Sequence, residues 1–301
     1  MEVYGSVLVS RNHKQGAMLQ GSALPRKSPK MGNTTLSMAK RNGLSNTEPT
    51  NPRITNGIWA DYITTAVRTG DAKRGASGVS VLVIPLNVQG VTRRKLKNSG
   101  VAASGSTFLE FDNVRVPVSH LLGKENQGFQ IIMSSSFPSN AFNKDFNAER
   151  LGLAIQALSL SRVCLQDSYM HALTRETFSR KLISHQIIRH KIGLMSSRIA
   201  SMHSWLESLI HTLKIDPNDE SLPQALSLAK VQGGRLLEYC SREAQQIFGG
   251  AGYQRGSGKG SRVEQISRDV RVNVVGGGSE EILIDLAVRM GLKRVSRLAK
   301  I

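Results

Sequence analysis

One apolar stripe in the second half of the chain constrains the fold more than any other feature. Its seven positions, which recur at alternating steps of four and three residues, are Ile188, Ile192, Met195, Ile199, Met202, Leu206 and Leu209. Because this spacing returns to one side of an α-helix, the stripe predicts a long amphipathic helix. Similar spacing predicts helices over 147–174, 222–247 and 279–292, the second with Pro223 in its first turn. These faces must bury one another, which predicts an antiparallel four-helix bundle.

The residues before the helices have a different pattern. Runs rich in β-branched residues and bounded by turn residues occupy 62–68, 79–84, 107–111 and 114–116. Such runs are typical of short antiparallel strands, so residues 54–125 are expected to form a small β domain. The predicted organisation continues with a helical domain over 126–292 and a basic tail over 293–301.

Residues 1–53 show no sustained period and stay unassigned. Their composition is basic, rich in serine and nearly free of acidic residues. It fits either a mitochondrial transit peptide or a disordered leader.

The composition narrows the class of protein. The chain carries 40 Lys and Arg against 22 Asp and Glu, a formal net charge of +18. This charge suits nucleic acid, an anionic membrane or an anionic small molecule. It is spread along the chain, however, and the aromatic residues, which make up 5%, do not interleave with basic runs. A nucleic-acid binder is therefore the weaker alternative, which salt-dependent retention on DNA would test.

No apolar run approaches the roughly 18 residues of a membrane-spanning helix, so no membrane partner is expected. The two cysteines, Cys164 and Cys240, fall among apolar residues at helical spacing and lack a CxxC pattern. They are expected to be buried thiols in a reducing compartment, and no metal site is predicted.

The glycine-rich stretch at 249–260 matches no standard phosphate-loop pattern. Tyr253 and Gly260 stand where a Walker A loop requires glycine and Ser or Thr. Arg255 stands where the GxGxxG fingerprint requires its third glycine. The residue patterns alone thus predict a β domain joined to a helical bundle, but they do not indicate a function.

Five segments, in fixed order, resemble the acyl-CoA dehydrogenase family, whose FAD-dependent flavoenzymes desaturate acyl thioesters. The matching segments are 54–57 with 60–62, 123–129, 175–178 with Gln186, 246–253, and 268–269 leading into 276–282. The resemblance implies an α+β fold, with a partial antiparallel β-barrel middle domain followed by a C-terminal antiparallel four-helix bundle. It also implies association into homodimers or homotetramers.

The same resemblance implies a reaction. A carboxylate removes the α proton of a fatty or branched-chain acyl-CoA while hydride passes to flavin N5. The family takes this base either from the loop before the last helix or from the first bundle helix. Gly277 fills the loop position and cannot act as a base, whereas Glu149 fills the helix position. The resemblance therefore implies Glu149 as the base; the alternative is an acidic residue favoured by the helix dipole.

The other site residues are likewise implied by the resemblance. The substrate-binding residues would be Asn147, Arg150, Gly277 and Gly278, with the Gly277 N–H as the oxyanion donor. The FAD-binding residues would be Ile54, Thr55, Arg175, Gln186, Gln246, Ile247, Phe248, Gly249, Gly250, Ser279 and Glu281.

Two further expectations concern the ends of the chain. The N-terminal helical domain and flavin loop of the family are not recognisable in 1–53, so a truncated enzyme that binds FAD poorly or not at all is expected. The alternative function is a catalytically inactive helical oligomerisation module. Ala299-Lys300-Ile301 resembles a peroxisomal import tripeptide, with the mitochondrial matrix or the cytoplasm as alternatives. The electron acceptor would be oxygen or an unknown acceptor in the first case and electron-transfer flavoprotein in the mitochondrion.

Overall fold

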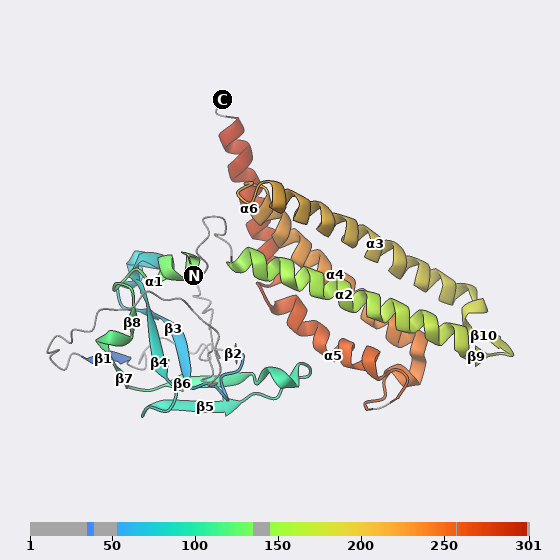
Figure 1. Cartoon of the computed structure of the whole chain (residues 1–301), viewed down its shortest axis with the longest axis horizontal. Coiled ribbons are helices and arrows are strands. Elements are labelled where there is room, and N and C mark those ends of the chain that lie inside the picture. The colour runs from blue at the N-terminus through green and yellow to red at the C-terminus, as the bar shows by residue number, and fades with distance from the viewer. Residues whose placement is uncertain (1–34, 39–52, 135–144, 257, 300–301) are drawn as a thin grey trace. The chain divides into compact units, whose positions relative to one another are not determined.

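The computed structural model of the chain describes residues 35–38, 53–134, 145–256 and 258–299 (Figure 1). The chain divides into two compact units. One comprises residues up to 98 together with 102–135, and the other comprises 99–101 and 136–301. The first is built mainly from strands and the second mainly from helices. Most of the predicted leader and the last two residues of the predicted import tripeptide lie outside the described residues.

The strands that the structure describes in the first unit form three antiparallel sheets. One sheet has the order β3-β4-β8, a second has the order β2-β6-β5, and β1 pairs with β7. The bounds are β1 Thr35–Met38, β2 Arg53–Ile54, β3 Tyr62–Arg68, β4 Val79–Pro85, β5 Val91–Lys95, β6 Thr107–Phe111, β7 Val114–Pro117 and β8 Leu121–Leu122. A short helix, α1 (Gly128–Ser134), follows β8. Over the described residues the sheets do not close into a barrel.

The strands predicted from β-branched runs are present. Those at 62–68 and 79–84 are β3 and β4, which pair along their whole length and bring Ile63 opposite Ile84 in the core. Those at 107–111 and 114–116 are β6 and β7, but these two do not pair with each other. Instead β6 pairs with β2 and β5, while β7 pairs with β1.

Strand β5 was not predicted, because its sequence, Val-Thr-Arg-Arg-Lys, is mostly polar and charged. Four of its five residues are exposed, so it has no buried face to produce alternation. Within its sheet it is an edge strand, where charged side chains protect unpaired backbone groups from association.

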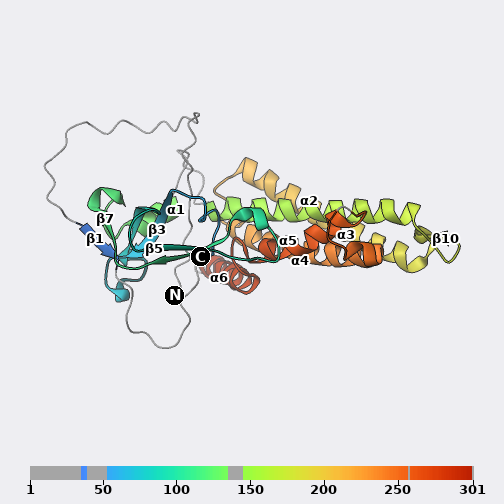
Figure 2. The same cartoon turned by 90° about the horizontal axis from the view of Figure 1, so that it is seen from below.

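The second unit contains five helices that the structure describes. Their bounds are α2 Asp145–Thr174, α3 Gln186–Ile215, α4 Leu222–Phe248, α5 Ser261–Val275 and α6 Glu280–Leu298. A small hairpin of β9 (Glu176–Thr177) and β10 (Arg180–Lys181) connects α2 to α3. Helices α2, α3 and α4 lie side by side in both views (Figure 2). Helix α4 contacts each of the other four helices, so it is the centre of this unit.

The predicted stripe is the buried face of α3. Ile188 is partly buried, and the six fully buried members are Ile192, Met195, Ile199, Met202, Leu206 and Leu209. The helices predicted over 147–174 and 222–247 are present as α2 and α4. The last predicted helix is present as α6 but continues to Leu298.

Helix α5 was not predicted. Its few buried apolar residues include Val263, Ile266 and Val274, and most of its other positions are charged or polar. An apolar face this short gives too weak a helical period to read from sequence. None of the helices in the described ranges is long and apolar enough to cross a bilayer.

Candidate functional site

The start of α2 lies beside the loop that connects α5 to α6. The Arg150 Nε donates a hydrogen bond to the Gly277 carbonyl oxygen at 3.3 Å, and its Nη1 donates to the Asn147 Oδ1 at 3.2 Å. Asn147 is buried, whereas Glu149, on the same turn, is exposed. The structure thus brings together four of the predicted substrate-site residues with the predicted base: Asn147, Glu149, Arg150, Gly277 and, next along the loop, Gly278.

This loop, residues 276–278, requires glycine. Gly277 and Gly278 have φ angles of 67° and 113°, in the left-handed region that other residues rarely adopt. A Cβ at position 277 would lie 2.9 Å from the Leu153 Cδ1. A side chain at 277 would therefore meet both backbone strain and a steric clash.

A buried cation that the sequence analysis did not single out lies behind the loop. Lys230 is in α4 and is only 2% exposed. Its Nζ donates to the Val274 carbonyl oxygen at 2.5 Å and to the Gly278 carbonyl oxygen at 2.7 Å. A signal existed in the sequence, because Lys230 interrupts the apolar face formed by Leu226, Gly233 and Leu237.

Burial and adjacent charges determine the pKa values of the two cations beside the loop. Removal of water from its ammonium group lowers the pKa of Lys230; the Glu280 and Glu149 carboxylates act in the opposite direction. Burial also lowers the pKa of Arg150, again opposed by Glu149. The Glu149 carboxylate is therefore close enough to both cations to interact with them.

The predicted FAD-binding residues 175, 186 and 246–250 lie at the other end of the helical unit. Arg175 follows the last residue of α2, Gln186 begins α3, and residues 246–250 cover the end of α4 and the turn after it. The Arg175, Gln186 and Gln246 side chains are exposed. Gly249 and Gly250 are also exposed, and a Cβ at either position would meet nothing within 4 Å, so their backbone is open. The Ile247 and Phe248 side chains are buried in the core, which leaves only their backbone groups for a ligand.

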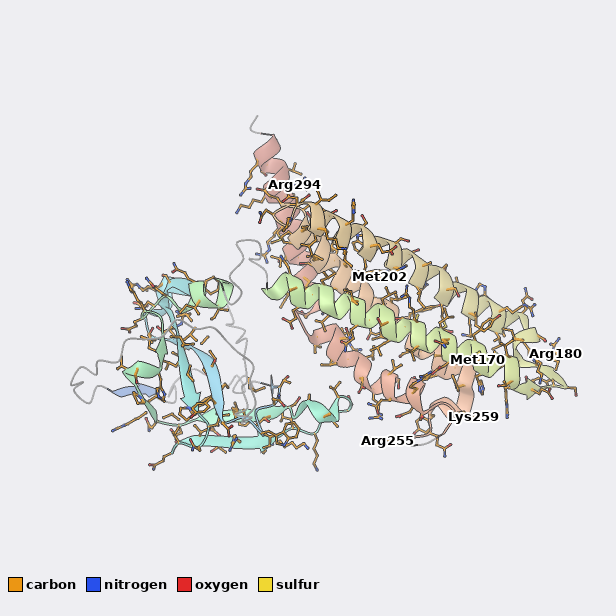
Figure 3. The ribbon with its side chains drawn as sticks, in the orientation of Figure 1. Met170, Arg180, Met202, Arg255, Lys259 and Arg294 are labelled. Atoms are coloured by element: carbon orange, nitrogen blue, oxygen red, sulfur yellow. The ribbon has the colours of Figure 1, made fainter. Side chains whose placement is uncertain are left out.

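Several cations lie at the same end of the helical unit as this glycine turn. Arg180, Arg255 and Lys259 lie at the end of the helical unit that carries the β9-β10 hairpin (Figure 3). The His171 ring stacks on the Phe248 ring with centroids 4.3 Å apart. Burial lowers the pKa of His171, as do the nearby Arg175 and Lys259, which favours its neutral form. The nearby cations and the exposed backbone at Gly250 suit an anionic group such as a diphosphate, whereas the Gly249 N–H already donates to the Gln245 carbonyl oxygen.

The predicted site residues are therefore split between two ends of the unit. Glu149 and Thr174, the last residue of α2, are 25 residues apart on one helix. At a rise of about 1.5 Å per residue they are roughly 38 Å apart. Ser279 and Glu281 lie at the Glu149 end, at the start of α6. Ile54 and Thr55 belong to the β unit, where Ile54 is buried in the core and Thr55 is exposed.

No group of three or more His, Cys, Asp or Glu side chains in the described ranges could hold a metal ion. The arrangement thus offers, at one end, the Glu149 and Glu280 carboxylates near Lys230 and a glycine loop, and at the other end an exposed glycine turn.

The comparisons with known proteins identify this architecture. A mixed α and β fold like this one occurs in the solved structure of a probable acyl CoA dehydrogenase from Mycobacterium abscessus. The two superpose with a TM-score of 0.68 at 37% identity, over 78% of this chain and 58% of that one. Residues 139–292 match the family model described as acyl-CoA dehydrogenase, C-terminal domain.

The chain belongs to the acyl-CoA dehydrogenase family, whose members are FAD-dependent oxidoreductases. It is 44% identical over 249 residues to acyl-CoA dehydrogenase AFT10-1 of Alternaria alternata, covering 81% of this chain and 55% of that protein. It is 38% identical over 244 residues to acyl-CoA dehydrogenase apdG of Emericella nidulans, covering 80% and 53%. The chain thus spans about half the length of these relatives.

Proposed function

We propose that this chain catalyses the α,β-desaturation of an acyl-CoA thioester with FAD, and that Glu149 is the catalytic base. The observation that supports this most is the hydrogen bond from Arg150 to Gly277, because it holds the helix turn that bears Glu149 against the glycine loop. Glycine at position 277 offers no competing carboxylate. Glu149 thus lies on the helix turn that this hydrogen bond holds against a loop with backbone groups for a developing oxyanion.

Each residue at this end has a role in the proposal. Glu149 accepts the α proton of the thioester, and the Gly277 N–H stabilises the negative charge that develops on the carbonyl oxygen. Asn147, Arg150 and Gly278 bind the thioester and the coenzyme A side of the substrate. FAD, when bound, supplies the acceptor for the hydride that leaves the β carbon.

The chain's residues fit FAD at both ends of the helical unit. The exposed glycine turn at 249–250, with Arg175, Gln186, Gln246 and the backbone of residues 247–248, would hold its anionic part. Ser279 and Glu281 would contact it at the Glu149 end. Ile54 and Thr55, in the β unit, are the remaining residues proposed to bind FAD. Two ends about 38 Å apart on one helix are too distant for one FAD. We therefore propose that each FAD lies between two copies of the chain, in a homodimer or homotetramer.

The finer architecture is part of the same proposal. Helices α2, α3, α4 and α6 would form the four-helix bundle, and α5 would be an addition to it. The contacts of α4 with α2, α3 and α6 are those this bundle requires, and α5 packs on both α2 and α4. The antiparallel sheets of the first unit would be part of a β-barrel.

Replacement of the proposed base tests the reaction. Glu149→Gln keeps the size of the side chain but cannot accept a proton. With FAD in excess, turnover of acyl-CoA should fall by about 10²–10⁴-fold, while flavin binding stays unchanged. The matched control is Glu207→Gln, at an exposed position on α3, which should keep wild-type turnover.

Two results would count against the proposal. Equal turnover of Glu149→Gln and the wild type would remove Glu149 as the base. A wild-type chain that self-associates, but neither binds flavin nor oxidises any acyl-CoA, would instead be the inactive oligomerisation module.

The location and acceptor are proposed from the C-terminal tripeptide alone. We propose import into peroxisomes through residues 299–301, with oxygen as the acceptor. A fluorescent fusion that loses peroxisomal signal when these residues are deleted would support this. A mitochondrial signal would favour electron-transfer flavoprotein.

A further inference from the structure

Lys230 is the one lysine among the buried polar and charged residues of the part of the chain that the structure describes. A buried ammonium group is costly unless hydrogen bonds replace its lost water. Here two backbone carbonyl oxygens do so, from Val274 and Gly278. Neither the sequence pattern nor the reaction proposed above assigns this residue a role.

The two carbonyl groups that Lys230 contacts lie on either side of Gly277. Val274 is in the last turn of α5, where carbonyl groups lack helical partners and favour a cation. Gly278 is the last residue before the N-cap of α6. One ammonium group therefore ties the end of α5 to the far side of the loop.

The loop needs such a tie because it consists of three consecutive glycines. Glycine loses more conformational freedom on ordering than any other residue, so this segment is intrinsically flexible. Arg150 fixes the Gly277 carbonyl group from α2, and Lys230 fixes both flanks from α4. The Lys230 Cε is 3.9 Å from the position of a Cβ built on Gly277, so its stem also lies against the loop.

We propose that Lys230 is a positioning residue, which holds the backbone of Gly277 in the single conformation that serves as the oxyanion donor. This rests on the proposed function, since it assigns the Gly277 N–H to the thioester oxygen. Lys230 acts only through the loop and does not touch the substrate. A loop freed from Lys230 would donate its hydrogen bond in only a fraction of its conformations.

The test compares Lys230→Met with Leu237→Ala. Leu237 is fully buried in the same helix, so its truncation lowers stability without removing a partner of the loop. In Lys230→Met, amide hydrogen exchange of residues 276–279 should accelerate, and kcat should fall by about 10–10²-fold with flavin binding and KM little changed. In Leu237→Ala, exchange in this loop and kcat should stay near wild type. Lys230→Gln, which retains an N–H donor, should be intermediate and serves if the methionine variant does not fold.

Unchanged exchange of residues 276–279 in Lys230→Met overturns the proposal, whatever the activity of the wild type. Faster exchange with unchanged kcat also overturns it, since the loop would then be free without consequence. A wild type without flavin or turnover refutes the proposed function instead, while the exchange measurement still decides whether Lys230 orders the loop.

Discussion

The buried glutamates of the helical unit accept hydrogen bonds from lysine and arginine side chains. Glu243, on α4, accepts hydrogen bonds from Lys191 and Arg242. Glu264, on α5, accepts from Arg268 one turn later at 2.6 Å. Removal of one member of such a pair leaves a buried charge uncompensated, which costs more than the pair contributes.

The two thiols are buried without activation, and this gives a prediction about reactivity. Cys164 and Cys240 are both 0% exposed. Burial raises the pKa of Cys164 to about 12 and that of Cys240 to about 11, because the thiolate is poorly solvated there. Since the thiolate is the nucleophile, neither cysteine should react with a thiol reagent in the native protein at neutral pH. Both should react once the protein is unfolded in urea, which is the control.

The same shifts set a pH dependence with a definite sign. In the folded state both thiols keep their protons at a pH where an unfolded thiol has lost its own. The folded state therefore binds more protons between the unfolded and folded pKa values, and its free energy of unfolding decreases as pH rises through that alkaline range. Substitution of both cysteines by alanine should weaken this dependence. Rapid labelling of the native wild type would contradict the burial of the thiols.

At the scale of elements, α2 and α4 approach closely because Gly233, on the side of α4 that contacts α2, has no side chain. A Cβ on Gly233 would lie 3.2 Å from the Ala154 Cα and 3.4 Å from the Ala157 Cβ. Glycine on α4 and two alanines on α2 therefore set the distance between the two helices.

A larger side chain at position 233 should push α2 and α4 apart. Gly233→Leu should lower the free energy of unfolding by about 1–3 kcal/mol, the usual cost of overpacking a core. The matched control is Gly193→Ala on α3, where a Cβ would meet nothing within 4 Å. It should stabilise the protein by about 0.5–1 kcal/mol, because alanine loses less backbone freedom in a helix. Urea unfolding followed by helical circular dichroism measures both; a neutral Gly233→Leu would show that the contact can relax.

The elements were predictable where one face is apolar and long. The stripe from Ile188 to Leu209 reflects burial on one side of α3, and β3 and β4 are runs of β-branched residues between turn residues, so the sequence reveals all three. Helix α5 and strand β5 were missed because charged residues cover most of their surface. Strand pairing could not be predicted either, since Asp112-Asn113 predicts a turn after β6 but does not indicate which strand pairs with β7.

The site was predictable in part, for a different reason. The resemblance names residues but not the distances between them, and Lys230 binds only backbone carbonyl groups, whose positions depend on the fold. At the scale of the whole molecule, the helix predicted over 147–174 already separates Glu149 from Arg175 by most of its length, and α2 has that length. An FAD site that uses both must take them from different copies.

Complementation between two inactive variants tests this shared site. Glu149→Gln removes the base at one end, and Arg175→Glu reverses a charge at the other, so either variant alone should have little activity. In a mixed pair, one site combines an intact Glu149 from one copy with an intact Arg175 from the other, while the second site carries both changes. Mixed oligomers purified through two different tags should therefore recover about half of the wild-type activity per pair, with flavin in half of the sites. A site built within one copy would leave every mixed oligomer inactive, and an active Arg175→Glu homo-oligomer would remove Arg175 from the site altogether.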